Sequence, residues 1–283
     1  MKTLVHLGDG DHSRWAVRRE DGGRTEEAAL PASLADLLAL PLAEARSLVE
    51  SATDWQPVTD EPQILPPVDR QEVWAAGVTY LRSRDGRAEE SAHAAMYDLV
   101  YDAERPEVFF KATPERVVPP GAPVGIRADS GWDVPEPEIG LVVNSSAEVF
   151  GYVAGNDMSS RSIEGENPLY LPQAKVYARS CALGPGIVPV WERPDTPVRI
   201  AMQIHRDGQV VFDGSSSTGS MRRSFSELVD CLFRAMDFPA GVVLLTGTGV
   251  VPDSGFTLRE GDRIVVDVAE VGVLSNPVTV VGR

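Results

Sequence analysis

Short runs of β-branched and other apolar residues, separated by proline and glycine, dominate the chain after residue 70. Such runs are typical of strands that end at turns, and helical spacing is rare in this part. They include EVWAAGV, EVFFKA, EIGLVV, EVFGYVAGN, VRIAMQIHRDGQVVFDG, VVLLTGT and RIVVDVAEVGVLSNPVTVV. So much strand with so little helix predicts an α+β chain that is mostly β, arranged as a sandwich or barrel.

Two local signals are clear within this region. Asp207 and Gly208 lie between alternating flanks, a pattern typical of a tight β-hairpin. The segment SFSELVDCLFRAMDFP has helical spacing of apolar residues, and either Ser224 or Ser226 can cap its first turn. We expect a hairpin at the first position and a helix at the second.

The first part of the chain has a different pattern. Two alternating runs over residues 3–18, around a Gly/Asp turn, predict a hairpin. Residues 33–51 have helical spacing after Ser33, a suitable N-cap, and Pro41 interrupts the pattern. We expect a strand pair followed by helix here.

Proline and charged residues are frequent over residues 57–70, as in a linker. A chain of 283 residues is long enough for one large domain and a small appendage. We therefore expect a small N-terminal α/β domain over residues 1–65 and a large domain over residues 70–283.

Composition excludes some partners. Lys and Arg number 26 against 42 Asp and Glu, and the formal charge of -16 repels nucleic acid and anionic lipid. The N-terminus has no apolar stretch like that of a signal peptide, and no later run is long enough to span a membrane, so we expect a cytoplasmic protein. Cys181 and Cys231 form no metal-binding motif, and we assign them no chemistry.

Two glutamates stand one residue apart at the start of an apolar run, in EPEIGLVVN. On a strand, Glu136 and Glu138 would direct their carboxylates to the same side, where they repel unless a cation lies between them. Mg²⁺, Mn²⁺ or Ca²⁺ suits such oxygen ligands better than Zn²⁺. The alternative is that both glutamates lie on a solvated edge.

A third acid, Asp157, follows a strand in GYVAGNDMSSR. An Asn-Asp pair is typical of a turn, which would present the side chain rather than bury it. By itself this aspartate can be a turn former or a helix cap. Together with the two glutamates it can complete a set of three metal ligands.

The order of these motifs resembles the fumarylacetoacetate hydrolase superfamily. EPEIGLVVN, GYVAGNDMSSR, AKVYARSCALGP and LLTGTGVV stand in the order of that family, and the resemblance covers about residues 70–283. It implies a mixed β-sandwich roll, a homodimer formed through residues 70–283, and Mg²⁺ bound by Glu136, Glu138 and Asp157.

Within the superfamily, SSRSIEGENPLYLPQAKVY and ERPEVFFKAT are similar to the 2-keto-3-deoxy-D-arabinonate dehydratase branch. Carbon–carbon hydrolases of the family have a histidine that activates water three residues after the tyrosine that corresponds to Tyr80. This chain has Ser83 there. His93 could move in from its predicted surface helix, and the other three histidines lie outside the motifs. Residues 79–98 have the polar, charged composition of a mobile lid or of an exposed helix.

The resemblance implies chemistry on a 2-oxo acid. A metal chelated by the carboxylate and keto oxygens of such a substrate stabilises the enolate that forms when a proton leaves C3. Lys175 can act as the base or as a fixed positive charge, and Glu107 can protonate a departing hydroxyl. The ordinary alternatives are a surface lysine and a solvated strand-end glutamate.

Five further residues are expected to contact the anionic substrate. Arg161 and Lys111 carry suitable charge, although Arg161 can instead brace the metal ligands. Thr248 lies between glycines in TGTG, where a hydroxyl and backbone N–H groups can hold a carboxylate, or where the chain simply turns. Thr79 and Arg82 flank Tyr80 and complete the expected set.

Three functions remain open from the sequence. The first is a Mg²⁺-dependent lyase that dehydrates a 2-keto-3-deoxy sugar acid, a pentonate, to 2,5-dioxopentanoate. The second is a hydrolase that cleaves a carbon–carbon bond of an acylpyruvate or related diketo acid. The third is a metal-dependent protein that binds a 2-oxo acid without turnover. The missing histidine favours the first over the second.

Overall fold

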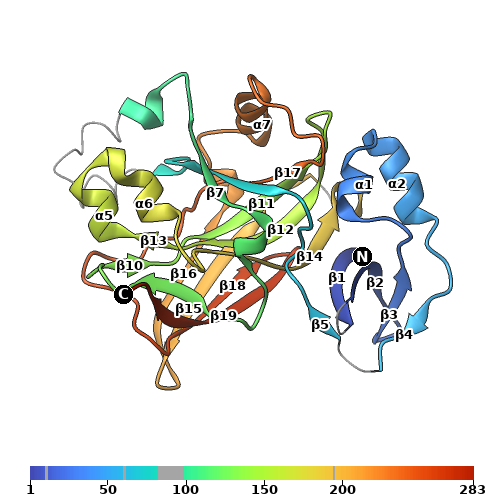
Figure 1. Cartoon of the computed structure of the whole chain (residues 1–283), viewed down its shortest axis with the longest axis horizontal. Helices are drawn as coiled ribbons and strands as arrows, with labels where there is room; N and C mark the ends of the chain where they lie inside the picture. Colours follow the sequence, from blue (N-terminus) through green and yellow to red (C-terminus); the bar gives the residue numbers. More distant parts are fainter. Residues whose placement is uncertain (10–11, 60–61, 82–98, 194) are drawn as a thin grey trace.

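Two β-sheets form the body of the protein (Figure 1). The computed structural model describes residues 1–9, 12–59, 62–81, 99–193 and 195–283. The larger sheet has the strand order β4-β3-β2-β1-β14-β12-β11-β17-β6-β7, with β5 beside β1 and β8 beside β14. The smaller has the order β16-β15-β18-β19-β9, and β10 pairs with β13.

The strands of the larger sheet, in chain order, are β1 Lys2–Asp9, β2 His12–Asp21, β3 Arg24–Ala29, β4 Gln56–Pro57, β5 Gln63–Ile64, β6 Glu72–Gly77, β7 Glu107–Ala112, β8 Val117–Val118, β11 Pro137–Val143, β12 Val149–Asp157, β14 Cys181–Pro189 and β17 Val242–Leu245. The others are β9 Val124–Arg127, β10 Asp133–Val134, β13 Ser159–Ser160, β15 Arg199–Arg206, β16 Gln209–Ser217, β18 Arg263–Val268 and β19 Gly272–Val281. Most neighbours are antiparallel, whereas β17–β6, β14–β8 and β19–β9 are parallel. The expected α+β fold, mostly β with mixed sheets, is confirmed.

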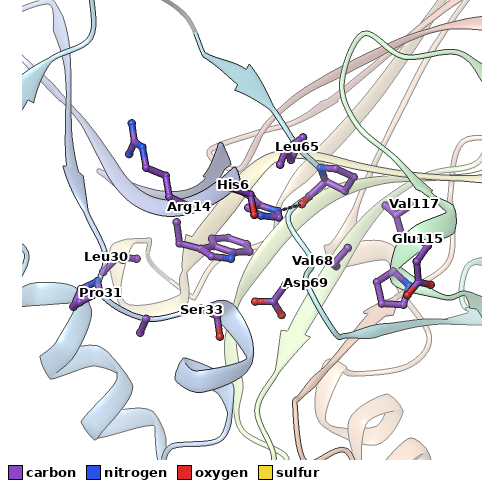
Figure 2. A pocket seen from close by; sticks show the side chains of 15 residues that line it. His6, Arg14, Leu30, Pro31, Ser33, Leu65, Val68, Asp69, Glu115 and Val117 are labelled. Atoms are coloured by element: carbon purple, nitrogen blue, oxygen red, sulfur yellow. Dashed lines mark hydrogen bonds between the residues drawn. The ribbon is translucent and has the colours of Figure 1, made fainter. Parts of the chain in front are cut away.

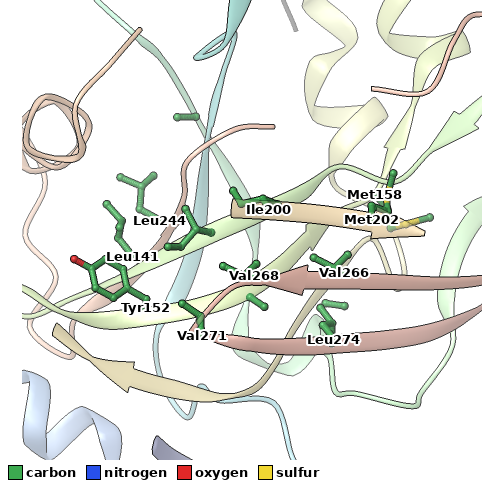
Figure 3. Packing of buried hydrophobic residues seen from close by; sticks show 14 of the residues in the cluster. Leu141, Tyr152, Met158, Ile200, Met202, Leu244, Val266, Val268, Val271 and Leu274 are labelled. Atoms are coloured by element: carbon green, nitrogen blue, oxygen red, sulfur yellow. The ribbon is translucent and has the colours of Figure 1, made fainter. Parts of the chain in front are cut away.

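A hydrophobic core lies between the two sheets. Figure 3 shows side chains from β11, β12 and β17, such as Leu141 and Leu244, packed against side chains from β15, β18 and β19, such as Val266 and Leu274. Each aliphatic side chain fully buried in such a core contributes about 1.5–3 kcal/mol relative to an exposed one. This packing makes β11 and β12 a rigid base for the residues at their ends.

Helices are short and lie around the sheets. Those that lie wholly within the described residues include α1 Leu34–Leu38, α2 Leu42–Glu50, α5 Arg161–Glu166, α6 Leu171–Lys175 and α7 Phe225–Phe233, and the 3-10 turns η1 Pro114–Arg116, η2 Pro168–Tyr170, η3 Val190–Glu192 and η4 Thr218–Ser220. In the described part of the chain, no helix has the length and apolar character that a membrane crossing requires.

The local sequence signals are confirmed. Ser33 caps α1 in a capping box with Asp36, and α2 starts directly after Pro41. Ser224, not Ser226, caps α7 in the same way. β15 and β16 form the predicted hairpin, in which Asp207 and Gly208 have φ values of 51° and 77°.

The N-terminal strands and helices lie to one side of the molecule (Figure 1). β1 and β2 form the predicted hairpin, and β1 also pairs with β14 at Leu4 and Ile187. A second core is shared between this part and the rest of the chain, because Leu34 and Trp15 cluster with residues such as Phe150. The division into domains over 1–65 and 70–283 therefore stays a prediction.

Candidate metal centre and active site

Three buried carboxylates meet where β11 and β12 lie side by side. Glu136 directly precedes β11, Glu138 is its second residue, and Asp157 ends β12. The antiparallel pairing places Glu138 opposite Gly155, so that Asp157 lies near both glutamates. All three residues are at most 4% exposed, and one oxygen from each lies within 4.8 Å of the others. The solvated-edge alternative for the glutamates is thereby excluded.

Asp157 differs from its expectation in one respect. It was expected in a turn past the strand, with its side chain presented to solvent, but β12 continues through it and pairs Asp157 with Cys181 of β14. The turn prediction for Asn156 and Asp157 is therefore wrong. The pairing along β14 extends the strand, and neighbouring cations compensate the buried charge.

Lys175 places its ammonium among these carboxylates. Its Nζ lies 2.6 Å from Glu136 Oε2, 3.1 Å from Asp157 Oδ2 and 2.5 Å from Ser159 Oγ. The side chain is fully buried at the C-terminal end of α6. The surface-lysine alternative is wrong for this residue.

Arg161 holds the other side of Glu136. Its Nη2 donates to Glu136 Oε1 at 2.7 Å, and its Nη1 lies 3.4 Å from Oε2 of Glu164, one turn later on α5. The guanidinium is almost fully buried. This geometry fits the alternative in which Arg161 braces a metal ligand.

The surroundings of Glu138 disfavour its ionised form. Burial, with the negative charges of Asp157 and Glu136 next in effect, raises the pKa of Glu138 well above its usual value. The backbone N–H of Gly247 donates to its Oε2 at 2.6 Å and partly opposes this shift. A third negative charge is costly here without a further cation.

The residues present fit a divalent cation. The donors are all carboxylate oxygens, which Mg²⁺, Mn²⁺ and Ca²⁺ prefer. The ammonium of Lys175 lies against two of these carboxylates, which shows that a cation is accommodated beside them. Of the described Asp, Glu, His and Cys residues, only Glu136, Glu138 and Asp157 form a group that could hold a metal ion.

Lys111, expected to bind substrate, is buried beside Asp157. Its ammonium forms an ion pair with Asp157 Oδ1 and donates to the backbone oxygens of Met158 at 2.9 Å and Lys175 at 2.5 Å. Its side chain has no exposed surface. Whether it also contacts substrate stays a prediction.

Glu107 starts β7 and lies opposite Gly77 of β6. Its carboxylate crosses directly over this glycine, because a Cβ at position 77 would be 2.0 Å from Glu107 Oε2. Across the sheet from β6, the next strand is β17 and the one after it is β11, which carries Glu138. On the same face of β7, the ring of Phe109 lies 5.7 Å from Lys175 Nζ.

The two threonines make hydrogen bonds inside the protein. Thr79 is fully buried and its hydroxyl donates to the carbonyl oxygen of Thr246 at 2.7 Å. Thr248 forms a tight turn in which its Oγ1 accepts from the Val250 N–H at 3.1 Å. Both flank Gly247, which contacts Glu138. Their roles in substrate binding stay predictions.

Several predictions fall outside the described residues. Arg82, Ser83 and His93 belong to the segment 82–98, as does most of the expected lid over 79–98. The other three histidines lie on β1, β2 and β15, away from the ends of β11 and β12.

Burial raises the pKa of the Cys181 thiol to about 12. A thiol with such a pKa stays protonated at neutral pH, in agreement with the sequence analysis, which assigned this cysteine no chemistry.

A cavity of about 790 Å³ lies elsewhere, between β1, β2 and the linker (Figure 2). His6 stacks on Trp15 there, with ring centroids 4.8 Å apart, and its Nδ1 donates to the carbonyl oxygen of Pro66 at 2.9 Å. None of the three acids of the metal centre lines this cavity. His6 is accordingly a packed, hydrogen-bonded residue at the junction of the two parts.

Sequence reasoning missed three contributors to the centre. The hydroxyl of Ser159 accepts a hydrogen bond from the Lys175 ammonium, and the backbone N–H of Gly247 donates to the Glu138 carboxylate. Gly77 lacks a Cβ and so leaves space for the Glu107 carboxylate. Ser159 and Gly247 lie inside the quoted motifs, which was the available signal. Gly77 could not be found, because its importance depends on which residue faces it across the sheet.

Comparison with known proteins agrees with this geometry. Residues 73–279 match the model of the fumarylacetoacetate (FAA) hydrolase C-terminal family. A probable 2-keto-3-deoxyxylonate dehydratase from Haloferax volcanii is 53% identical over 216 residues, which cover 76% of this chain and 74% of the relative. A 2-dehydro-3-deoxy-D-arabinonate dehydratase from Saccharolobus solfataricus is 41% identical over 221 residues, with the same coverage.

A solved structure extends the likeness to the whole chain. It is a 2-keto-3-deoxy-D-arabinonate dehydratase in complex with magnesium and 2,5-dioxopentanoate, with a TM-score of 0.87, 32% identity and full coverage of both chains. The family match spans most of the sequence and includes all three acids of the metal centre. The chain belongs to the fumarylacetoacetate hydrolase C-terminal family.

Proposed function

We propose that this protein is a Mg²⁺-dependent hydro-lyase that converts a 2-keto-3-deoxypentonate to 2,5-dioxopentanoate. The observation that carries the proposal is the buried triad Glu136, Glu138 and Asp157 with Lys175 between its carboxylates. Relatives that are 41% and 53% identical over three quarters of the chain and bear dehydratase names support the reaction type.

Glu136, Glu138 and Asp157 would hold the metal. Mg²⁺ bound there would supply Lewis-acid polarisation of the 2-keto oxygen and positive charge for an enolate. Arg161 keeps Glu136 oriented from the side opposite Lys175, since the two cations contact different oxygens of that carboxylate. The N–H of Gly247 orients Glu138 in the same way.

Lys175 and Glu107 would move the protons. Lys175 takes the proton from C3 or stabilises the resulting enolate with its charge, and Glu107 gives a proton to the hydroxyl that leaves C4. The C3–H and C4–O bonds break and one water departs. The remaining hydroxymethyl carbon, C5, then becomes the aldehyde by isomerisation, so that no oxidant is needed.

Residues around this centre would contact the substrate. Thr79 and Thr248 flank the Gly247 segment, and Arg82 completes the proposed set from the segment outside the described residues. Their hydroxyls and guanidinium suit a carboxylate and a chain of hydroxyl groups. The roles of Arg161 and Lys111 are better explained by their contacts with the acids.

Relative turnover tests this function. We expect 2-keto-3-deoxyarabinonate or 2-keto-3-deoxyxylonate to be consumed in the presence of Mg²⁺ and to persist in EDTA. An acylpyruvate is expected to be a poor substrate under the same conditions, because Ser83 cannot accept a proton from water unaided. Faster cleavage of the acylpyruvate would contradict the proposal.

We also propose a cytoplasmic homodimer that forms through residues 70–283. Light scattering is expected to give twice the chain mass of 30.5 kDa. A variant without residues 1–65 should keep this ratio if circular dichroism shows that it is folded, a necessary check because the second core is shared. A full chain that scatters as a single copy would contradict the dimer.

A further inference from the structure

Lysine is rare in this chain. Of 26 Lys and Arg residues only Lys2, Lys111 and Lys175 are lysines. Two of the three lie at the candidate centre, each with a fully buried side chain. A lysine differs from an arginine in carrying a compact charge with three donors that point in different directions. The centre therefore contains two side chains of a type that the rest of the protein almost avoids.

The ammonium of Lys111 makes three contacts inside the protein. It donates hydrogen bonds to the carbonyl oxygens of Met158 and Lys175, and it forms an ion pair with Asp157 Oδ1. Its charge is thus satisfied by the protein itself, and its side chain has no exposed surface. A substrate carboxylate would have to displace one of these partners from a buried charge, which is costly.

The three contacts join three separate elements. Lys111 lies on β7, which begins with Glu107; Asp157 ends β12; and Lys175 ends α6. Each of these elements carries one residue of the proposed reaction. A single ammonium therefore fixes the relative positions of the proposed acid, a metal ligand and the proposed base.

An irregularity in β7 accompanies the unusual contacts of Lys111. The register between β6 and β7 shifts at Lys111: Val73 lies opposite Ala112 and Trp74 opposite Phe110. Lys111 thus has no partner opposite it on β6, as in a β-bulge. Bulges redirect a side chain out of the regular alternation and are common next to active sites.

We infer that Lys111 is a positioning residue for the proposed reaction and not a substrate ligand. It holds the carboxylate of Asp157 in one orientation and fixes the backbone of Lys175, from which the catalytic ammonium extends. The inference rests on the proposed function for its link to catalysis, while the arrangement itself can be tested without turnover.

The test uses Lys111→Met, which keeps an unbranched side chain one atom shorter and removes the ammonium, with Lys2→Met as the matched control on β1. We expect kcat to fall by about 10- to 100-fold, as for other residues that orient metal ligands, with KM for the sugar acid nearly unchanged. A large rise in KM with kcat unchanged would instead show a substrate ligand and overturn the inference.

A second readout follows the lysines directly. Protein labelled with ¹³C at lysine Cε has three lysine signals, which Lys2→Met and Lys175→Met assign. In Lys111→Met the Lys175 signal should shift, even in EDTA and without substrate. An unchanged Lys175 signal together with unchanged kcat and a lower melting temperature would reduce Lys111 to a purely structural role and overturn the inference.

If Lys111→Met does not fold, spectra of the labelled wild-type protein can distinguish a positioning residue from a substrate ligand. Addition of Mg²⁺ and pyruvate, a simple 2-oxo acid, should move the Lys175 signal more than the Lys111 signal. The reverse order would show that Lys111 contacts the ligand and would contradict the inference. These spectra do not depend on which sugar acid reacts, so their outcome is separate from a failure of the dehydratase proposal.

Discussion

Glu136→Gln, Glu138→Gln and Asp157→Asn are each expected to abolish Mg²⁺-dependent turnover, with a loss of at least about 100-fold, while the protein stays folded. Each change removes the negative charge of one of the three carboxylates that form this group among the described residues. Isothermal titration should show a matching loss of Mg²⁺ affinity. Glu166→Gln, an exposed change on α5, is the control and should behave as wild type.

Glu138→Gln gives the sharpest form of this prediction. Because burial and the two neighbouring acids raise the pKa of Glu138, metal-free protein gains little from its charge. The variant should therefore melt in EDTA at or above the temperature of wild type, although it is inactive. Full activity of EDTA-treated wild-type protein, or full activity of all three variants, would contradict the metal site.

Glu107→Gln is expected to lower kcat by about 10²- to 10⁴-fold, the contribution of a general acid. An amide cannot protonate the leaving hydroxyl, whereas the length of the side chain is kept. Glu104→Gln, an exposed change just before β7, and Ser83→Ala should each have a much smaller effect. Steady-state kinetics with Mg²⁺ measures all three.

Gly77→Ala tests the same group without changing it. A Cβ at position 77 would overlap the Glu107 carboxylate, which must then move from its place over β6. We expect a substantial loss of kcat with the metal affinity unchanged. Wild-type rates in both Glu107→Gln and Gly77→Ala would exclude Glu107 from the reaction.

Helix ends and turns that depend on neighbouring residues could be predicted from the sequence. Ser33 and Ser224 cap helices through a capping box, Pro41 separates two helices, and Asp207 with Gly208 forms a hairpin turn. Each depends on the conformational preferences of a few neighbouring residues. These preferences act in the same way in almost any fold.

The acids of the metal centre could also be predicted, because strand alternation and motif order both pointed to them. Their surroundings could not. The turn expected at Asp157 became strand because β14 pairs with it, and residues 157 and 181 are far apart in the sequence. The contacts of Lys111 depend in the same way on β7, β12 and α6 coming together. Tertiary packing, not local preference, decides such features.

The product formed from a 2-keto-3-deoxypentonate tests the central claim most directly. With Mg²⁺ and ¹³C-labelled substrate, NMR should show loss of the C4 carbinol signal and appearance of the C5 aldehyde of 2,5-dioxopentanoate, and EDTA should stop the change. An unchanged sugar acid, together with efficient cleavage of an acylpyruvate that places ¹⁸O from labelled water in the released acid, would show a hydrolase and contradict the account.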